Sequence, residues 1–152
     1  MSGIGKRSAE IILSEIGLDM SRFPTAAHLA SWSGLCPGNN ESAGKRKSGK
    51  TNKGNKYLKS TLIQCAKSAQ KDKNSFFHAQ YQRLVVRRGA NRASVAVAHS
   101  MLIAIYHMLK DNVPFKDLGS DYYTKFNTEK KANYYLKKLQ ELGVVIPVSM
   151  TT

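Results

Sequence analysis

Apolar residues recur at helical spacing along most of this chain of 152 residues. In six segments they fall three or four positions apart, which is typical of helices that turn one face toward a core. Segments with the alternation of a strand are far fewer. We therefore expect a mainly α fold, a single compact helical domain over residues 1–152, with helices over residues 6–16, 26–33, 55–70, 75–88, 91–110 and 127–142.

The segment Asn91–Lys110 is the most hydrophobic of these helices, so we expect it at the centre of the core. Asn74 and Asn91 have the short polar side chains that cap helix N-termini, and we expect them to begin the fourth and fifth helices. The last helix belongs to a C-terminal helix and tail, residues 121–152, with a short extended end at Val144–Val148. Its predicted inward residues are Ala132, Leu136 and Leu139.

The first residues form a turn of the type Gly-apolar-Gly, Gly3-Ile4-Gly5, which leads directly into a helix. A helix-hairpin-helix element begins in this way, and its backbone N–H groups can hold one nucleic-acid phosphate. We therefore predict a helix-hairpin-helix-like element in which Gly3, Gly5 and Lys6 contact nucleic acid. The first helix of such an element would lie before Met1, so we expect the chain to begin within a larger domain arrangement.

The formal net charge of +14 is concentrated in the middle of the chain. Between Ser42 and Lys110 there are 15 Lys and Arg residues, and the single acidic residue among them is Asp72. The remainder of the chain holds nine residues of each sign. A basic block of this kind is typical of proteins that bind a phosphate backbone, and no basic amphipathic helix favours a membrane surface instead. DNA or RNA is the expected partner, and no membrane is expected.

The most basic stretch is the Gly/Lys-rich loop at residues 39–55, within the sequence NNESAGKRKSGKTNKGNKYL. Glycines in it allow a close approach of the backbone to a ligand. Residues 44–51, GKRKSGKT, also match the phosphate-loop pattern of nucleotide hydrolases. That loop requires a buried strand before it, and SGLCPGNNESA cannot form one. The cations predicted to contact nucleic acid are Lys45, Arg46, Lys47, Lys50, Lys53 and Lys56.

Other phosphodiester chemistry finds little support in the sequence. Two-metal cleavage needs several converging carboxylates, and we expect no metal site in this chain. Capping, turn and salt-bridge roles explain Asp111, Asp117 and Asp121 better. No local pattern promotes a Ser-His-Asp triad or a tyrosine nucleophile. A hydroxyl nucleophile inside the polycation remains, and from the residues alone Ser42 is best situated, with Ser48 and Thr51 left as rivals.

Cys36 and Cys65 are far apart with no metal-binding pattern, which favours free thiols in a reducing compartment. Apolar runs fall short of the roughly 18 residues of a membrane span. We therefore expect a soluble protein of the prokaryotic cytoplasm, associated with the nucleoid.

The run SAGKRKSGKTNKGN from Ser42 to Asn55, with Leu58 and Leu62 in the helix after it, resembles the signature of one transposase family. It is similar to the C-terminal transposase domain of the insertion-sequence family numbered one hundred and ten, whose members are guided by a bridge RNA. The similarity extends to GIGKRSAEIILSEIG and RFPTAAHLASWSGLCPG before the signature, and to RRGANRASVAVAHSMLIAIYHML and PFKDLGSDYY after it. Ala43 stands where many members have glycine.

The resemblance implies DNA transposition or recombination in which Ser42 attacks a DNA phosphate and forms a covalent phosphoserine link. It also implies that Lys45, Arg46 and Lys50 hold the strand or the guide RNA. Members pair this domain with an N-terminal RuvC-like domain whose Asp-Glu-Asp-Asp set binds magnesium, and the intact protein is expected to be a homo-oligomer. We expect this chain to be the C-terminal part alone, without cofactor and inactive by itself. The alternative is a non-catalytic helix-hairpin-helix module that binds nucleic acid.

Overall fold

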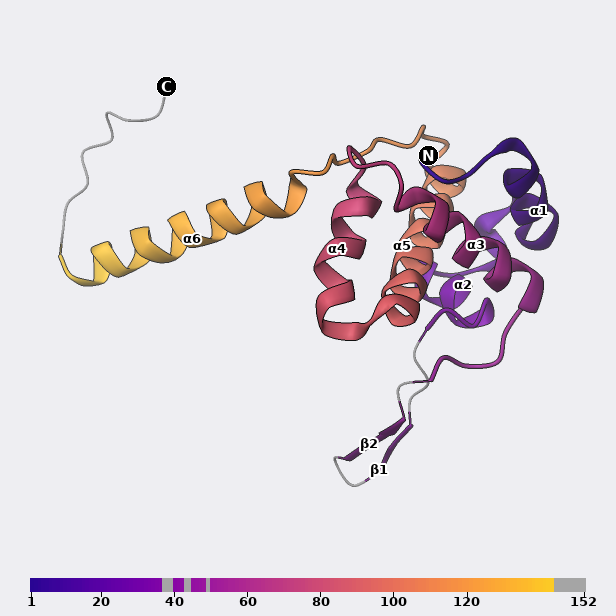
Figure 1. Ribbon diagram of the computed structural model, residues 1–152, viewed down its shortest axis with the longest axis horizontal. Helices are drawn as coiled ribbons and strands as arrows, with labels where there is room; N and C mark the ends of the chain where they lie inside the picture. Colours follow the sequence, from indigo (N-terminus) through magenta and orange to yellow (C-terminus); the bar gives the residue numbers. More distant parts are fainter. Residues whose placement is uncertain (37–39, 43–44, 49, 144–152) are drawn as a thin grey trace.

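The computed structural model describes residues 1–36, 40–42, 45–48 and 50–143, with side chains in residues 40–42 and 45–48 left aside. It confirms the mainly α fold (Figure 1). The predicted extended end at residues 144–148 lies outside this description. The elements are α1 (Lys6–Ile16), a short 3-10 helix η1 (Met20–Arg22), α2 (Ala26–Trp32), β1 (Asn40–Ser42), β2 (Lys45–Ser48), α3 (Lys56–Ala69), α4 (Phe76–Arg88), α5 (Ala90–Asp111) and α6 (Tyr122–Glu141).

Helix α5 is the centre of the core, as its hydrophobicity predicted. It packs against α2, α3 and α4, while α1 covers another side of α3. Eight residues of α5 are buried, which explains why this helix is long and apolar enough to cross a membrane by length and composition. The apolar spacing of the other core helices predicts one buried face on each, and the residues buried there are Ile12, Ile16, Leu29, Ala30, Leu58, Leu62, Cys65, Ala66, Ala69 and Phe77.

The two predicted asparagine caps are wrong by one or two residues. Ser75, not Asn74, caps α4, because its hydroxyl accepts the backbone N–H of His78 at 3.2 Å. Helix α5 begins at Ala90 rather than at Asn91. Gly89 lies at the boundary of both helices with φ +76°, a conformation that glycine adopts without a steric penalty, so the chain turns there within a single residue.

Helix α6 differs most from the prediction. It begins at Tyr122, five residues before the predicted start, and none of its residues is buried. Its predicted inward residues are wrong: Leu136 and Leu139 are 43% and 37% exposed, and Ala132 is exposed as well. Figure 1 shows α6 extending away from the body formed by α1 to α5, and among the described helices and strands α4 alone contacts it.

Aromatic rings make the junction between α6 and the body. Phe76, in the first turn of α4, packs edge-on against Tyr122 with ring centroids 5.2 Å apart, and it stacks on Tyr123 at 5.5 Å. Phe77, the next residue of α4, stacks on Phe115 from the connection between α5 and α6 at 5.7 Å. The first turn of α6 is thereby attached to the body.

Candidate nucleic-acid interface

The basic loop contains a hairpin that the sequence analysis did not predict. Strands β1 and β2 pair antiparallel and project from the helical body (Figure 1). Ser42, the last residue of β1, pairs with Lys45, and Glu41 pairs with Arg46. The register then shifts, because Asn40 pairs with Ser48 and Lys47 is an additional residue on β2. We call residues 37–50 the arm.

This hairpin supports the rejection of a nucleotide-binding loop. A phosphate loop joins a core strand directly to the helix whose N-terminus holds the phosphates. Here β2 lies inside the matching residues 44–51 and pairs only in a two-stranded sheet among the described residues, and α3 begins only at Lys56. The pattern GKRKSGKT is therefore not arranged as a phosphate loop.

Two glycines hold the two ends of the arm together. Gly34, with φ +73°, lies against the segment that returns from the arm, so that a Cβ on it would be 2.8 Å from the carbonyl oxygen of Asn52. A Cβ on Gly54 would meet the backbone of Ser33 and Gly34, at 2.5 Å from the carbonyl carbon of Ser33. No other residue type fits this backbone-to-backbone contact, which we call the glycine clasp.

Backbone hydrogen bonds reinforce the glycine clasp on both sides. The N–H of Asn52 donates to the carbonyl of Cys36 at 3.4 Å, and the N–H of Asn55 donates to the carbonyl of Trp32 at 3.3 Å. The chain thus leaves the body after α2 and returns to it before α3 at nearly the same point. The segments before and after the arm therefore lie side by side at the helical body.

Side chains of α3 and α1 fix the returning segment. The ammonium of Lys59 donates to the hydroxyl of Thr51 at 2.6 Å and approaches the carbonyl of Asn52 at 3.5 Å. The side chain of Asn55 accepts the N–H of Leu58 at 2.9 Å, which caps α3, and it donates to Glu15 of α1 at 2.5 Å. Thr51, a rival nucleophile on sequence grounds, therefore has its hydroxyl occupied by an ammonium group.

Sequence analysis missed the roles of Lys59, Asn55, Gly34 and Gly54. Lys59 follows Asn55 by one helical turn, and this spacing indicates that it can reach back to the residues before α3. No comparable local signal exists for the contact between Gly34 and Gly54, because 19 residues separate them along the chain.

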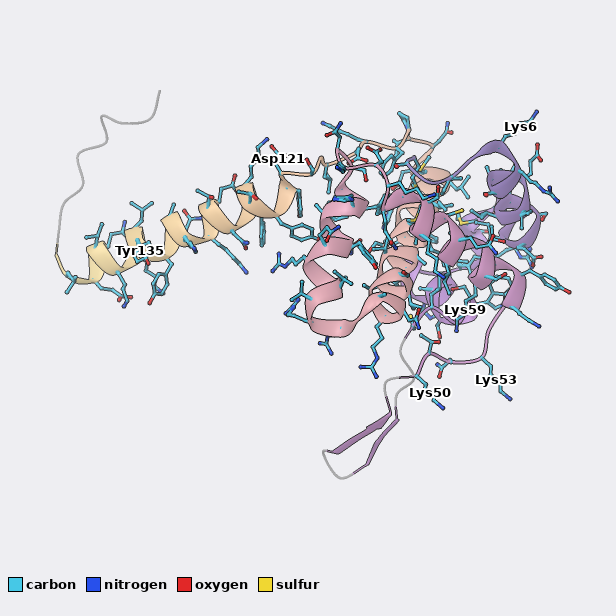
Figure 2. The ribbon with its side chains drawn as sticks, viewed as in Figure 1. Lys6, Lys50, Lys53, Lys59, Asp121 and Tyr135 are labelled. Carbon is cyan, nitrogen blue, oxygen red and sulfur yellow. The ribbon has the colours of Figure 1, made fainter. Side chains whose placement is uncertain are left out.

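The predicted cations fall into two groups. Lys45, Arg46 and Lys47 belong to β2, and Lys50, Lys53 and Lys56 are exposed along the segment that leads from the arm to α3. Figure 2 shows Lys50 and Lys53 at the base of the arm, whereas Lys6 is at the upper right, on α1. Of the cations whose side chains the structure describes, Lys50 and Lys53 lie together at the base of the arm, and Lys6 of α1 lies apart from them.

The N-terminal glycines have different environments. Gly3 has φ +80° and lies against α3, where a Cβ would be 2.7 Å from the backbone nitrogen of Ala69. Close packing therefore accounts for glycine at this position. Gly5 begins α1 with an extended backbone and has no neighbour within 4 Å of a Cβ. The predicted contact of this turn with a phosphate remains a prediction.

The acidic residues near the junction with α6 have the structural roles expected of them. Asp117 accepts the N–H of Phe76 at the start of α4 and the N–H of Gly119, each at 2.9 Å. Asp121 forms an ion pair with Lys125 at 2.5 Å, and this hydrogen bond lowers the pKa of the Asp121 carboxyl. Asp111 lies 3.4 Å from His107. Within the described ranges no group of three or more His, Cys, Asp or Glu side chains is arranged to hold a metal ion.

Comparison with known proteins agrees with the sequence resemblance. A family model described as "Transposase IS116/IS110/IS902 family" matches residues 1–82, which include α1 to α3, the arm and the first half of α4. The insertion element IS110 uncharacterized 43.6 kDa protein of Streptomyces coelicolor is 54% identical over 37 residues, which are 24% of this chain and 9% of that protein. No solved structure is significantly similar to the chain.

Proposed function

The chain belongs to the Transposase IS116/IS110/IS902 family, and on that premise we propose that it is a DNA transposase or recombinase domain whose arm supplies the serine nucleophile for strand cleavage and exchange. The nucleophile is Ser42. The cations of the arm and its base, Lys45, Arg46, Lys47, Lys50, Lys53 and Lys56, hold the nucleic-acid strand whose phosphate is attacked.

The observation that carries this proposal is the position of Ser42 at the outer end of a basic hairpin. Ser42 ends β1 opposite Lys45, and the neighbouring pair sets Arg46 opposite Glu41. A phosphate that approaches Ser42 therefore meets cationic residues at the end of a projecting strand pair. Ser48 pairs with Asn40 at the inner end of the hairpin, and the Thr51 hydroxyl accepts from Lys59, so both rivals are less well situated.

The reaction is a transesterification. The hydroxyl oxygen of Ser42 forms a bond to phosphorus, the bond from phosphorus to one deoxyribose oxygen breaks, and the Ser42 proton leaves to a base. A serine hydroxyl is a weak nucleophile, so the charge that develops on the phosphate oxygens must be neutralised, and lysine and arginine side chains are suited to this. The covalent link conserves the phosphodiester, which allows a second DNA end to displace Ser42.

Magnesium does not fit the residues that the structure describes, because they form no cluster of metal ligands. We therefore assign no step of the reaction to a metal bound by these residues. In the intact protein, magnesium would belong to a RuvC-like domain, and a guide RNA would select the DNA. The assembly would be a homo-oligomer in the bacterial cytoplasm, close to the nucleoid.

The test joins this chain to the RuvC-like domain of an intact family member and supplies guide RNA, magnesium and labelled DNA. We expect a covalent DNA–protein adduct that resists denaturing electrophoresis and that Ser42→Ala abolishes. Ser48→Ala makes the same chemical change at the inner end of the hairpin and should leave the adduct intact. An undiminished adduct in Ser42→Ala would exclude Ser42. DNA binding without adduct in the unaltered protein would favour a binding module without chemistry.

A further inference from the structure

A groove lies between α4 and the start of α6, on the part of the molecule from which α6 leaves the body. Its volume is about 420 Å³, within the range of ordinary ligand sites. Residues Phe76, Gln80, Arg83 and Arg87 of α4 and residues Tyr123 and Phe126 of α6 line it. We call it the α4–α6 groove. None of its lining residues belongs to the arm.

Aromatic rings form the α6 side of the groove. Tyr122 and Phe126 are stacked with an interplanar angle of 12° and centroids 6.1 Å apart, and Tyr123 is stacked on Phe76 at 23°. Phe126 is 42% exposed, whereas Tyr122 and Tyr123 are partly buried. Partial burial raises the pKa of the Tyr123 hydroxyl, so this group stays protonated and can donate a hydrogen bond. Tyr123 also carries the guanidinium of Arg83, and the ammonium of Lys130 lies 5.1 Å from the centroid of the Phe126 ring. A flexible lysine side chain can give way, so the exposed Phe126 ring is the one suited to stack a planar ligand.

Two arginines make the α4 side of the groove positively charged. The guanidinium of Arg83 lies over the Tyr123 ring, 4.7 Å from its centroid. Arg87 follows it by one helical turn, and both side chains are exposed. Among the residues with described side chains, neither arginine lies within 4.0 Å of a carboxylate oxygen. The groove therefore combines stacked rings with two cations that have no acidic partner in this part of the chain.

Gln80 joins α4 to α5 at the groove. Its Nε2 donates to the hydroxyl of Ser100, a residue of α5, at 2.7 Å. The α4 side of the groove is therefore fixed to the core.

We propose that the α4–α6 groove binds an unpaired nucleotide of a single-stranded nucleic acid. The base stacks on the exposed ring of Phe126 in place of the Lys130 ammonium, and Arg83 and Arg87 hold the flanking phosphates. Proteins that bind single strands combine aromatic platforms with a cationic track in this way. An acidic peptide would use the arginines but would leave the stacked rings without a planar partner. This proposal rests on the proposed function, because unpaired strands arise when a transposase cleaves and exchanges DNA. It adds a nucleic-acid contact outside the arm that carries Ser42.

The first experiment measures the affinity of the whole chain for fluorescein-labelled oligo-dT and oligo-U of about ten nucleotides, a length typical of single-strand sites. Phe126→Ala should weaken one or both probes by about 5- to 150-fold, which corresponds to the loss of one stacked base. Arg87→Gln should lower the salt dependence of log K by about 0.7. Arg88→Gln removes the same charge from a residue that does not line the groove and should change neither quantity. A duplex probe should bind all variants alike.

The second experiment locates the contact without relying on affinity. Oligonucleotides that carry 5-iodouracil are irradiated with the whole chain, and cross-linked peptides are identified by mass spectrometry. We expect the cross-link at Tyr122, Tyr123 or Phe126, and the preferred probe shows whether the strand is DNA or RNA. Cross-links confined to other residues would overturn the proposal, as would equal single-strand affinities of Phe126→Ala, Arg87→Gln and Arg88→Gln. If the unaltered chain bound neither duplex nor single strand, the proposed function would fail together with the groove.

Discussion

At the scale of single residues, the position of the arm depends on the contact between Gly34 and Gly54. Each glycine leaves room for the backbone of the other, and Gly34 also adopts a positive φ. Lys59 and Asn55 then fix the returning segment by side-chain hydrogen bonds. The residues that orient the arm are therefore remote in sequence from the serine that the arm carries.

This contact can be tested with one substitution made at two glycines. Gly54→Ser should lower the free energy of unfolding by about 1–3 kcal/mol, because the new Cβ meets backbone atoms that cannot move aside cheaply. Gly5→Ser places the same side chain where no atom lies within 4 Å and where serine is a good helix cap. It should change stability by less than about 0.5 kcal/mol. Urea denaturation measures both, and equal effects would contradict a clasp at Gly54.

At the scale of elements, the core helices and α6 show what apolar periodicity can and cannot predict. The spacing of Leu58, Leu62 and Cys65 predicted the buried face of α3 because the rest of the body covers that face. The same period in α6 predicted a buried face that does not exist, since periodicity indicates a suitable face but not a neighbour for it. The hairpin of the arm escaped prediction because KRKSG and NES contain no apolar alternation. Closure of the arm by Gly34 and Gly54 depends on tertiary contact, which no local pattern reports.

A matched pair of leucine substitutions tests the exposure of α6. Leu62→Ala removes a fully buried side chain from α3 and should cost about 2–5 kcal/mol of unfolding free energy. Leu139→Ala makes the same change on α6, where the side chain is 37% exposed, and should cost less than about 0.5 kcal/mol. Both values come from urea denaturation of the isolated chain. A large loss in Leu139→Ala would mean that α6 packs along its length against the body or a second copy.

At the scale of the whole molecule, the excess charge and the family membership point to the same class of partner. The basic block begins in the arm and continues through α3 and α4 to the end of α5. Affinity for nucleic acid should therefore depend steeply on salt, since each lysine or arginine that contacts a phosphate releases counterions. The slope of this dependence is the sum over all the lysines and arginines that contact a phosphate.

The salt dependence separates arm lysines from lysines elsewhere. For a DNA duplex, Lys53→Gln should reduce the slope of log K against log salt by about 0.9, the value for one lost phosphate contact. Lys137→Gln removes an equally exposed lysine from α6, outside the basic block, and should leave the slope unchanged. Fluorescence anisotropy titrations at several salt concentrations measure both. Identical slopes in the two variants would argue against the base of the arm as a duplex contact.

The glycine clasp also bears on how this domain can diversify. Because the chain enters and leaves the arm at one point, a change of length within residues 37–50 leaves the helices on either side in place. Lengthening such a closed excursion costs little, about 0.6 kcal/mol for each doubling of a flexible loop. The length and sequence of the arm can therefore change while the helical body that holds it stays the same. Exchange of arms between relatives should therefore leave the packing of the helical body intact.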